Sequence, residues 1–217
     1  MSTIEPAQSN PIKQWLAHFT SLDVDAPINL TLIEIGENDE PYIIYDTKGC
    51  YTSKFSAETE KSVLKIRERN ELKRETVTDV TIYYNTLSEI RISKAVTVCK
   101  NTLDSPLLDI IISSGASFVA TIDVKDLMID ITGKCSVKID GNALYQTANV
   151  STAEYNAINL ATTSTTITSS HNAVAYVDAT QRLEGKTAMG GKIFYNSYPE
   201  IFRSFIPVFG GEISKYK

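Results

Sequence analysis

The sequence lacks an excess of positive charge, long apolar segments and a cysteine framework. Its 217 residues include 21 Lys and Arg against 26 Asp and Glu, which gives a net charge of -5 at pH 7. Binding to phosphates needs clustered cations, so this acidic balance predicts no nucleic-acid partner. No apolar run approaches the roughly 20 residues of a membrane helix, so we expect a protein that does not span the membrane.

Cysteine and histidine are scarce, which argues against several kinds of site. Cys50, Cys99 and Cys135 form no CxxC pair, so we expect unpaired thiols, with one disulfide at most. His18 and His171 are far apart and belong to no HxH or HExxH motif, which argues against a zinc site. No GxSxG nucleophile elbow is present. The sequence therefore predicts a non-enzymatic protein with no catalytic residues, no cofactor and no metal ligands.

A secretion signal is also missing from the first residues. The start, MSTIEPAQSNP, has no basic segment followed by an apolar one. Two explanations remain open. Either the protein is cytoplasmic, or the sequence is a mature domain whose export signal has been replaced by a start Met.

What the sequence does have is period-two alternation of apolar and polar residues, which is typical of strands with one buried face. It predicts strands at 22–35, 63–72, 77–84 and 89–98. Two short stretches, PIKQWLAHF (11–19) and SAETEKSV (56–63), are the only candidate helices.

A repeat begins near residue 87. Small-residue turns separate apolar strands at SGAS (114–117), GKCS (133–136), STAE (151–154), SSHN (169–172), MGGK (189–192) and FGGE (209–212), with a weaker one at SKAV (93–96). The starts at 114, 133, 151, 169, 189 and 209 are 19, 18, 18, 20 and 20 residues apart. A fixed period of this length indicates a repeat architecture, and the strand patterns favour a β-solenoid of about 18–20 residues per coil.

In such a fold each coil buries its apolar side chains against the next coil. The period predicts three stacked pairs: Ile110 over Ile129, Ile112 over Ile131 and Phe118 over Val137. The expected turn glycines are Gly115, Gly133, Gly190, Gly191, Gly210 and Gly211, the first four with a positive φ. The Thr-rich stretch 161–170 is expected to be a largely solvent-facing wall.

The whole chain, 1–217, is expected to be one domain. Residues 1–86 would supply irregular N-terminal strands and a cap, and residues 87–217 the repeat coils. SYPEIFRSFIPVF (197–209) would form the last coil or an apolar patch that packs against another copy, so a homo-oligomer is one possible state.

Candidate surface residues come from two groups. Asp109 and Asp130, with Asp123, Asp126 and Asp140, could form a solvated face, a weak Ca²⁺ site or, least favoured, a lyase centre. Tyr83 and Tyr84 are adjacent on a strand, so one must face outward, where a tyrosine could bind carbohydrate. The mixed-charge segment 58–75 is a charged outer face or a contact for acidic glycans.

The order and spacing of these segments resemble the bacterial head GIN domain family of auto-transporter adhesin heads. FTSLDVDAPINLTLIEIGENDEPYIIY (19–45) is similar to the family's opening strands, and VLKIRERNE (63–71) to its middle strand pair. VTDVTIYYNTLSEIRIS (77–93) is similar to the segment that leads into the repeats, and SSGASFV, AMGGKIFY and FGGEISKY to its glycine-centred turns. STAE and SSHN lack the turn glycine, so the corner geometry of those coils departs from the pattern.

The resemblance implies a right-handed parallel β-helix-like fold and an exported protein of gut-type Gram-negative bacteria with a role in adhesion. The favoured hypothesis is a non-enzymatic envelope protein, periplasmic or on the cell surface, that binds a glycan or a host or envelope component. One alternative is a carbohydrate-binding or carbohydrate-active, pectin-lyase-like β-helix. The other is a self-assembling structural protein of the periplasm.

Overall fold

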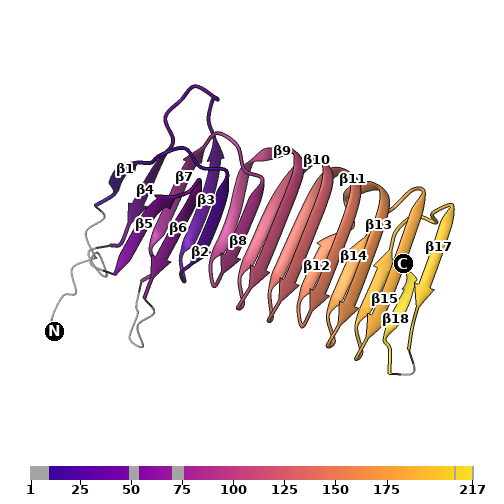
Figure 1. Ribbon diagram of the computed structural model, residues 1–217. Coiled ribbons are helices and arrows are strands. Elements are labelled where there is room, and N and C mark those ends of the chain that lie inside the picture. The colour runs from indigo at the N-terminus through magenta and orange to yellow at the C-terminus, as the bar shows by residue number, and fades with distance from the viewer. Residues whose placement is uncertain (1–9, 49–53, 70–75, 208, 217) are drawn as a thin grey trace, which may run out of the picture.

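A computed structural model describes residues 10–48, 54–69, 76–207 and 209–216. In this part of the chain there are eighteen strands and no helix, and hence no helix long and apolar enough to cross a membrane. The strands form a β-solenoid of about seven turns, with the first described strand, Ile12–Trp15, and the last, Glu212–Lys215, toward opposite ends of the rod (Figure 1). The all-β solenoid predicted from the sequence is therefore confirmed.

Two walls of strands enclose the core. The first wall consists, in spatial order, of β1 (Ile12–Trp15), β4 (Tyr42–Asp46), β7 (Asp79–Tyr84), β3 (Asn29–Glu34), the first parts of β9 (Val96–Ser113), β10 (Ser117–Thr132) and β11 (Ser136–Ser151), then β12 (Glu154–Ala157), β14 (Val174–Val177), β16 (Lys192–Tyr195) and β18 (Glu212–Lys215).

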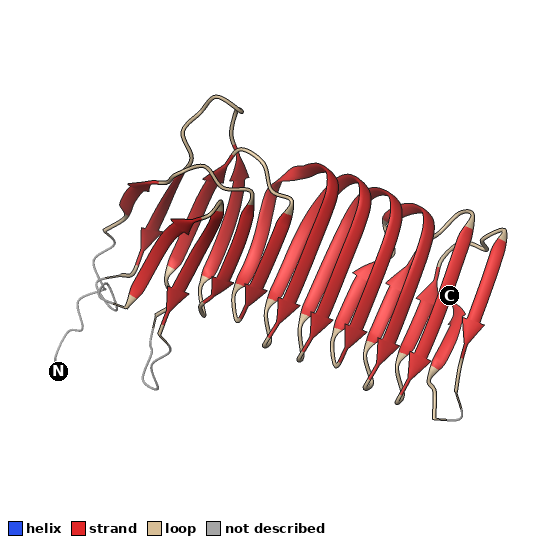
Figure 2. Cartoon of the chain, in the orientation of Figure 1, coloured by secondary structure: helices blue, strands red, loops and turns tan. Residues whose placement is uncertain are grey.

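The second wall consists of β5 (Phe55–Glu60), β6 (Val63–Glu68), β2 (Ser21–Asp25), β8 (Glu89–Ser93), the last parts of β9, β10 and β11, then β13 (Leu160–Ser170), β15 (Arg182–Ala188) and β17 (Ile201–Phe205). Strands β9 to β11 arch from the first wall to the second (Figure 2). From β9 onward the neighbouring strands are parallel, as a solenoid requires.

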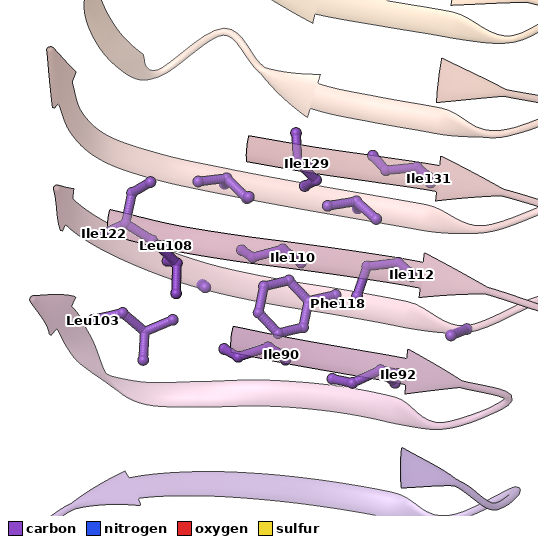
Figure 3. Close-up of a cluster of buried hydrophobic side chains, with 14 of the residues drawn as sticks. Ile90, Ile92, Leu103, Leu108, Ile110, Ile112, Phe118, Ile122, Ile129 and Ile131 are labelled. Atoms are coloured by element: carbon purple, nitrogen blue, oxygen red, sulfur yellow. The ribbon is translucent and has the colours of Figure 1, made fainter. Parts of the chain in front are cut away.

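The stacked pairs expected from the period are present. Ile110 pairs with Ile129, Ile112 with Ile131 and Phe118 with Val137. All six side chains are buried. Figure 3 shows the five that belong to β9 and β10, stacked together with Ile90 and Ile92 of β8. Each coil thus covers the apolar face of its neighbour, which is the main source of stability in a repeat fold.

The corners lie where the small-residue turns predict them, and non-glycine residues can build them. Thr152, His171 and Asn172 adopt positive φ values of 56°, 54° and 59°. The STAE and SSHN turns therefore keep the left-handed backbone without glycine, since Asn and other polar residues tolerate it at modest cost.

The turn glycines serve two different needs. Gly115, Gly133 and Gly190 have positive φ, as expected, whereas Gly191 does not, so that part of the prediction is wrong. A Cβ at Gly191 would lie 2.2 Å from the carbonyl oxygen of Ser169. Close approach of two backbones, rather than φ, requires glycine at this position. Gly210 and Gly211 also lie outside the positive-φ group.

The N-terminal part is irregular because strands are inserted out of chain order. Strand β2 lies between β6 and β8, and β3 lies between β7 and β9. Antiparallel strands β4 and β5 pair with β7 and β6 at this end of the rod. The segment predicted as one strand at 22–35 is divided into β2 and β3 around Pro27, and residues 70–72 of the strand predicted at 63–72 lie outside the described part.

Both candidate helices are wrong. The first contains β1, which pairs antiparallel with β4. The second lies in the hairpin of β5 and β6, where Lys61 and Ser62 have φ values of 50° and 63°. Two consecutive positive φ values match the twist of a two-residue hairpin turn, so the local sequence supports strands on both sides.

The Thr-rich stretch is not simply a solvent-facing wall, because several residues of β13 point inward. Thr162, Thr165, Ile167 and Ser169 are buried. Thr165 Oγ1 donates to Gln146 Oε1 at 3.1 Å. A second hydrogen bond, 2.7 Å long, joins Thr165 Oγ1 and Thr162 Oγ1. Ser169 Oγ donates to the carbonyl oxygen of Ala173 at 3.0 Å. The core therefore accepts these hydroxyls because each has a hydrogen-bond partner.

The two described cysteines carry free thiols. Cys99 lies in β9 and packs against the core, and burial raises the pKa of its thiol to about 12. Burial also raises the pKa of the Cys135 thiol. Both are therefore protonated and poorly nucleophilic near neutral pH. Cys50 lies outside the described residues.

Candidate functional site

Three aromatic side chains form a cluster on the outer side of the first wall, at its N-terminal end. Strand register places Trp15 beside Tyr42 and Tyr42 beside Tyr83. The rings of Tyr42 and Tyr83 stack with centroids 4.2 Å apart, and Trp15 meets Tyr42 edge-on at 5.3 Å. We refer to Trp15, Tyr42 and Tyr83 as the N-terminal aromatic cluster. Trp15 is still 58% exposed, so it offers apolar surface to a ligand.

A lysine completes this cluster. The Nζ of Lys13 lies 3.9 Å from the ring centroid of Trp15 and 3.8 Å from that of Tyr42. An ammonium group at this distance is attracted by the negative faces of the rings. Desolvation, followed by the influence of Tyr83, raises the pKa of the Tyr42 hydroxyl, which stays neutral at physiological pH.

A cavity of about 410 Å³ adjoins the cluster. Its lining residues are Trp15, Ile35, Asn38, Asp39, Glu40 and Tyr42. The lining thus combines aromatic rings from β1 and β4 with polar side chains from the loop between β3 and β4. That loop stands out from the edge of the rod (Figure 1).

Hydrogen bonds hold the loop in place. The side-chain amide of Asn85 donates to the carbonyl oxygens of Gly36 and Asp39, at 2.7 and 2.9 Å. The backbone N–H of Gly36 donates to Asp39 Oδ2 at 3.1 Å. The polar groups of the loop are therefore positioned before any ligand arrives, which lowers the entropic cost of binding.

A second aromatic cluster lies on the same outer side, near the C-terminal end. Tyr176 and Phe194 stack with centroids 5.4 Å apart, and Tyr216 stands perpendicular to Tyr176 at 5.5 Å. These rings, with Glu212, Ser214 and Lys215, line a cavity of about 280 Å³. Six strand spacings of about 4.8 Å separate β7 from β14, so the two clusters are about 29 Å apart.

Comparison with protein families gives a match over most of this chain. The model of the family described as "Putative auto-transporter adhesin, head GIN domain" matches residues 18–199. The chain belongs to the head GIN domain family. No curated protein is similar enough to count as a match.

Solved structures share the fold of this head GIN domain. A putative adhesin from Bacteroides fragilis is 15% identical, with a TM-score of 0.84 over 96% of this chain and 97% of that one. A putative adhesin from Parabacteroides distasonis is 19% identical, with a TM-score of 0.73 and the same coverage. A "Putative lipid binding protein" from Parabacteroides distasonis is 17% identical, with a TM-score of 0.71 and again the same coverage. At these identities the likeness shows the fold alone.

The structure separates the surface residues that the sequence grouped together. Tyr83 belongs to the N-terminal aromatic cluster. Tyr84 is only 1% exposed and packs in the core of the head GIN domain, so its prediction as a surface residue is wrong. The reason is the alternation of β7, in which Val80, Ile82 and Tyr84 all point inward.

Asp109 and Asp130 lie on the outer side of the second wall, away from Tyr83. Burial, followed by the negative charge of Glu89, raises the pKa of Asp109. Asp130 Oδ1 accepts a 2.7 Å hydrogen bond from Asn149. Within the described ranges, no group of three or more His, Cys, Asp and Glu side chains is placed to hold a metal ion. These positions therefore form no common site with the tyrosine.

Many charges in the mixed-charge segment are paired within the protein. Lys65 Nζ lies 2.7 Å from Glu60, and Arg67 Nη2 lies 2.5 Å from Asp23. Such pairing is what a charged outer face shows. Residues 70–75 of this segment lie outside the described part.

Sequence reasoning missed Trp15 and Tyr42, because it placed Trp15 in a candidate helix and gave Tyr42, within the opening strands at 19–45, no functional role. One signal was available. The segment YIIYD is rich in aromatic and β-branched residues and follows the polar loop, which is typical of a strand, whereas IKQW shows no alternation. Their meeting depends on an antiparallel pairing that the local sequence does not encode.

Proposed function

We propose that this head GIN domain is an exported, non-enzymatic protein of the cell envelope that binds a glycan or another surface component. Membership of a family described as adhesin heads supports an adhesive role, and so do neighbours titled as adhesins. The observation that carries the proposal is the presence of two aromatic clusters with adjoining cavities on one side of the rod. Exposed aromatic rings that border polar side chains are typical of recognition surfaces.

The first experiment is protease shaving of intact native cells, with the released peptides identified by mass spectrometry. Peptides from residues 110–200 in the supernatant of intact cells are the expected result. Their release only after the outer membrane is breached would contradict display on the surface and favour a periplasmic role. A periplasmic marker protein measured in the same samples controls for lysis.

A carbohydrate-active enzyme is the alternative that this aromatic surface also supports. Incubation with polygalacturonate, with and without Ca²⁺, tests it through new reducing ends and absorbance of unsaturated uronate. We expect neither product to form. Formation of either one would overturn the non-enzymatic part of the proposal.

Self-assembly is a second candidate, favoured by the C-terminal end of the rod. All five residues of β17 are exposed, and Phe202, Phe205 and Phe209 add apolar surface there. An exposed edge strand can pair with a strand of another copy. Light scattering after size exclusion tests this candidate. A mass of 24.0 kDa at every concentration would contradict it, and a larger mass that falls in Phe205→Glu would support it.

A further inference from the structure

The N-terminal aromatic cluster and the loop beside it have the composition of a carbohydrate site. Trp15 presents a flat apolar surface, onto which the C–H groups of a sugar ring can pack. Asn38, Asp39 and Glu40 bring an amide and two carboxylates to the same cavity. A sugar needs both features, because its rings carry apolar faces and its hydroxyls donate and accept hydrogen bonds.

The polar lining disfavours a purely apolar occupant. An acyl chain in this cavity would cover Asn38 and Glu40 without giving them hydrogen-bond partners. Burying polar groups without partners costs binding free energy. Sugar hydroxyls, in contrast, can donate to the carboxylate oxygens.

The charge of the loop narrows the class of sugar. Glu37, Asp39 and Glu40 place three carboxylates within four residues, and Lys13 adds one positive charge to the adjoining aromatic cluster. Lys13 already lies over the rings of Trp15 and Tyr42. The negative excess repels uronates and other anionic glycans and leaves neutral sugars favoured.

We propose that the N-terminal aromatic cluster and its cavity form a binding subsite for neutral hexopyranose residues of a glycan. This inference rests on the proposed function, because it names the partner class and the position of the same binding surface. Trp15 supplies the stacking surface, and Asn38, Asp39 and Glu40 hydrogen-bond the sugar hydroxyls. Asn85 positions the loop and does not touch the ligand.

The chain contains a single tryptophan, which makes fluorescence a direct test of this position. Cellohexaose, laminarihexaose, maltohexaose and mannohexaose are titrated separately against the full chain, with hexagalacturonate as the acidic probe. We expect a saturable change of Trp15 emission with at least one neutral hexaose and none with hexagalacturonate. No saturable change with any of the four, or a change with hexagalacturonate alone, would overturn the inference.

Variants measured by calorimetry separate stacking from unspecific effects. Trp15→Ala removes the stacking surface, and we expect binding to weaken roughly tenfold or more. Glu40→Gln keeps the shape of the side chain and removes one negative charge. This variant should still bind neutral sugars, and it should bind hexagalacturonate more tightly than the unchanged chain does. Tyr145→Ala is the matched control, since this ring is 47% exposed on the opposite wall. If Trp15→Ala binds as well as the unchanged chain, the subsite lies elsewhere.

The outcomes distinguish this inference from the proposed function. If Trp15→Ala loses sugar binding but protease releases no peptides from intact cells, the subsite is supported and display on the cell surface is refuted. Release of peptides from intact cells, with no response to any neutral hexaose, would keep the envelope role and refute the subsite. Circular dichroism confirms that each variant is folded before its binding is compared.

Discussion

Gly141 combines a positive φ with a close approach of the neighbouring coil, so a single added methyl group there should damage the stack of coils. Its φ is +114°, and it pairs with Ile122 of the preceding coil. A Cβ at this position would lie 2.1 Å from the carbonyl oxygen of Ile122 and 3.0 Å from its nitrogen. Both are backbone atoms, so no side-chain rotation relieves the contact, and β10 and β11 must separate.

The expected cost has two parts. Holding a residue other than glycine in such a region of φ costs about 1–3 kcal/mol. Separating two paired strands adds a loss of packing of similar size, so Gly141→Ala should reduce the free energy of unfolding by about 4 kcal/mol. For a chain of this size the melting temperature should fall by roughly 10 °C.

Gly115→Ala is the matched control for this substitution. Gly115 also has a positive φ, +79°, but a Cβ there would meet no atom within 4 Å. The free energy of unfolding of Gly115→Ala should therefore fall only by the cost of holding alanine at a positive φ, about 1–2 kcal/mol. Urea denaturation followed by far-UV circular dichroism gives both values. If the two variants are equally stable, close approach of neighbouring coils is not what requires Gly141.

Three further predictions concern the core, pH and the unity of the chain. Tyr155→Phe removes the hydroxyl that accepts a 2.5 Å hydrogen bond from buried Gln146. Urea denaturation should therefore show that the free energy of unfolding falls by about 1–3 kcal/mol. An unchanged free energy of unfolding would contradict this role of the hydroxyl. The Lys94 ammonium lies 2.7 Å from Asp25 and lowers the pKa of that carboxyl. The stability that this ion pair adds to the folded protein is therefore present above the pKa of Asp25 in the unfolded chain, and it is lost as the pH falls through the lower pKa of the folded state. Lys94→Met should thus be less stable than the unchanged chain at neutral pH, with a smaller difference near pH 2; an equal difference at both would refute the pairing. Residues 87–217 alone should show no cooperative unfolding by calorimetry, because they lack β2 and β3; a sharp transition would contradict our proposal of one domain.

The coils could be predicted from the sequence because each repeats the same local requirement. A turn of small residues, then apolar residues in alternation, recurs at SGAS and at GKCS, and neighbouring coils pair at that spacing. The position of Tyr84 was also within reach. Tyr84 lies two and four residues after Ile82 and Val80, so all three side chains point to the same face of β7. Since Val80 and Ile82 are apolar, that face could have been predicted to be the buried one.

The N-terminal order could not be predicted, because it depends on contacts that are distant in sequence. Nothing in the local pattern of β2 indicates that it is inserted between β6 and β8. The aromatic cluster inherits this difficulty, since Trp15 reaches Tyr83 only through two antiparallel pairings. A site assembled across three strands leaves no spacing motif.

The success of the prediction for the coils and its failure at the N-terminal end have a common physical cause. Within the repeat, every inward side chain must fit the coils before and after it, and Gly141 shows how little space remains between backbones. Among the residues that the structure describes, the loop between β3 and β4 forms backbone–backbone hydrogen bonds with neighbouring segments only at Ile35 and Pro41, and Asn85 holds the residues between them. Its residues can change without disturbing the stack, because loops on a rigid scaffold tolerate variation that packed repeats do not. Specificity for a partner is therefore best sought at the N-terminal end of the rod, where Trp15 and this loop line the same cavity, rather than along the regular coils.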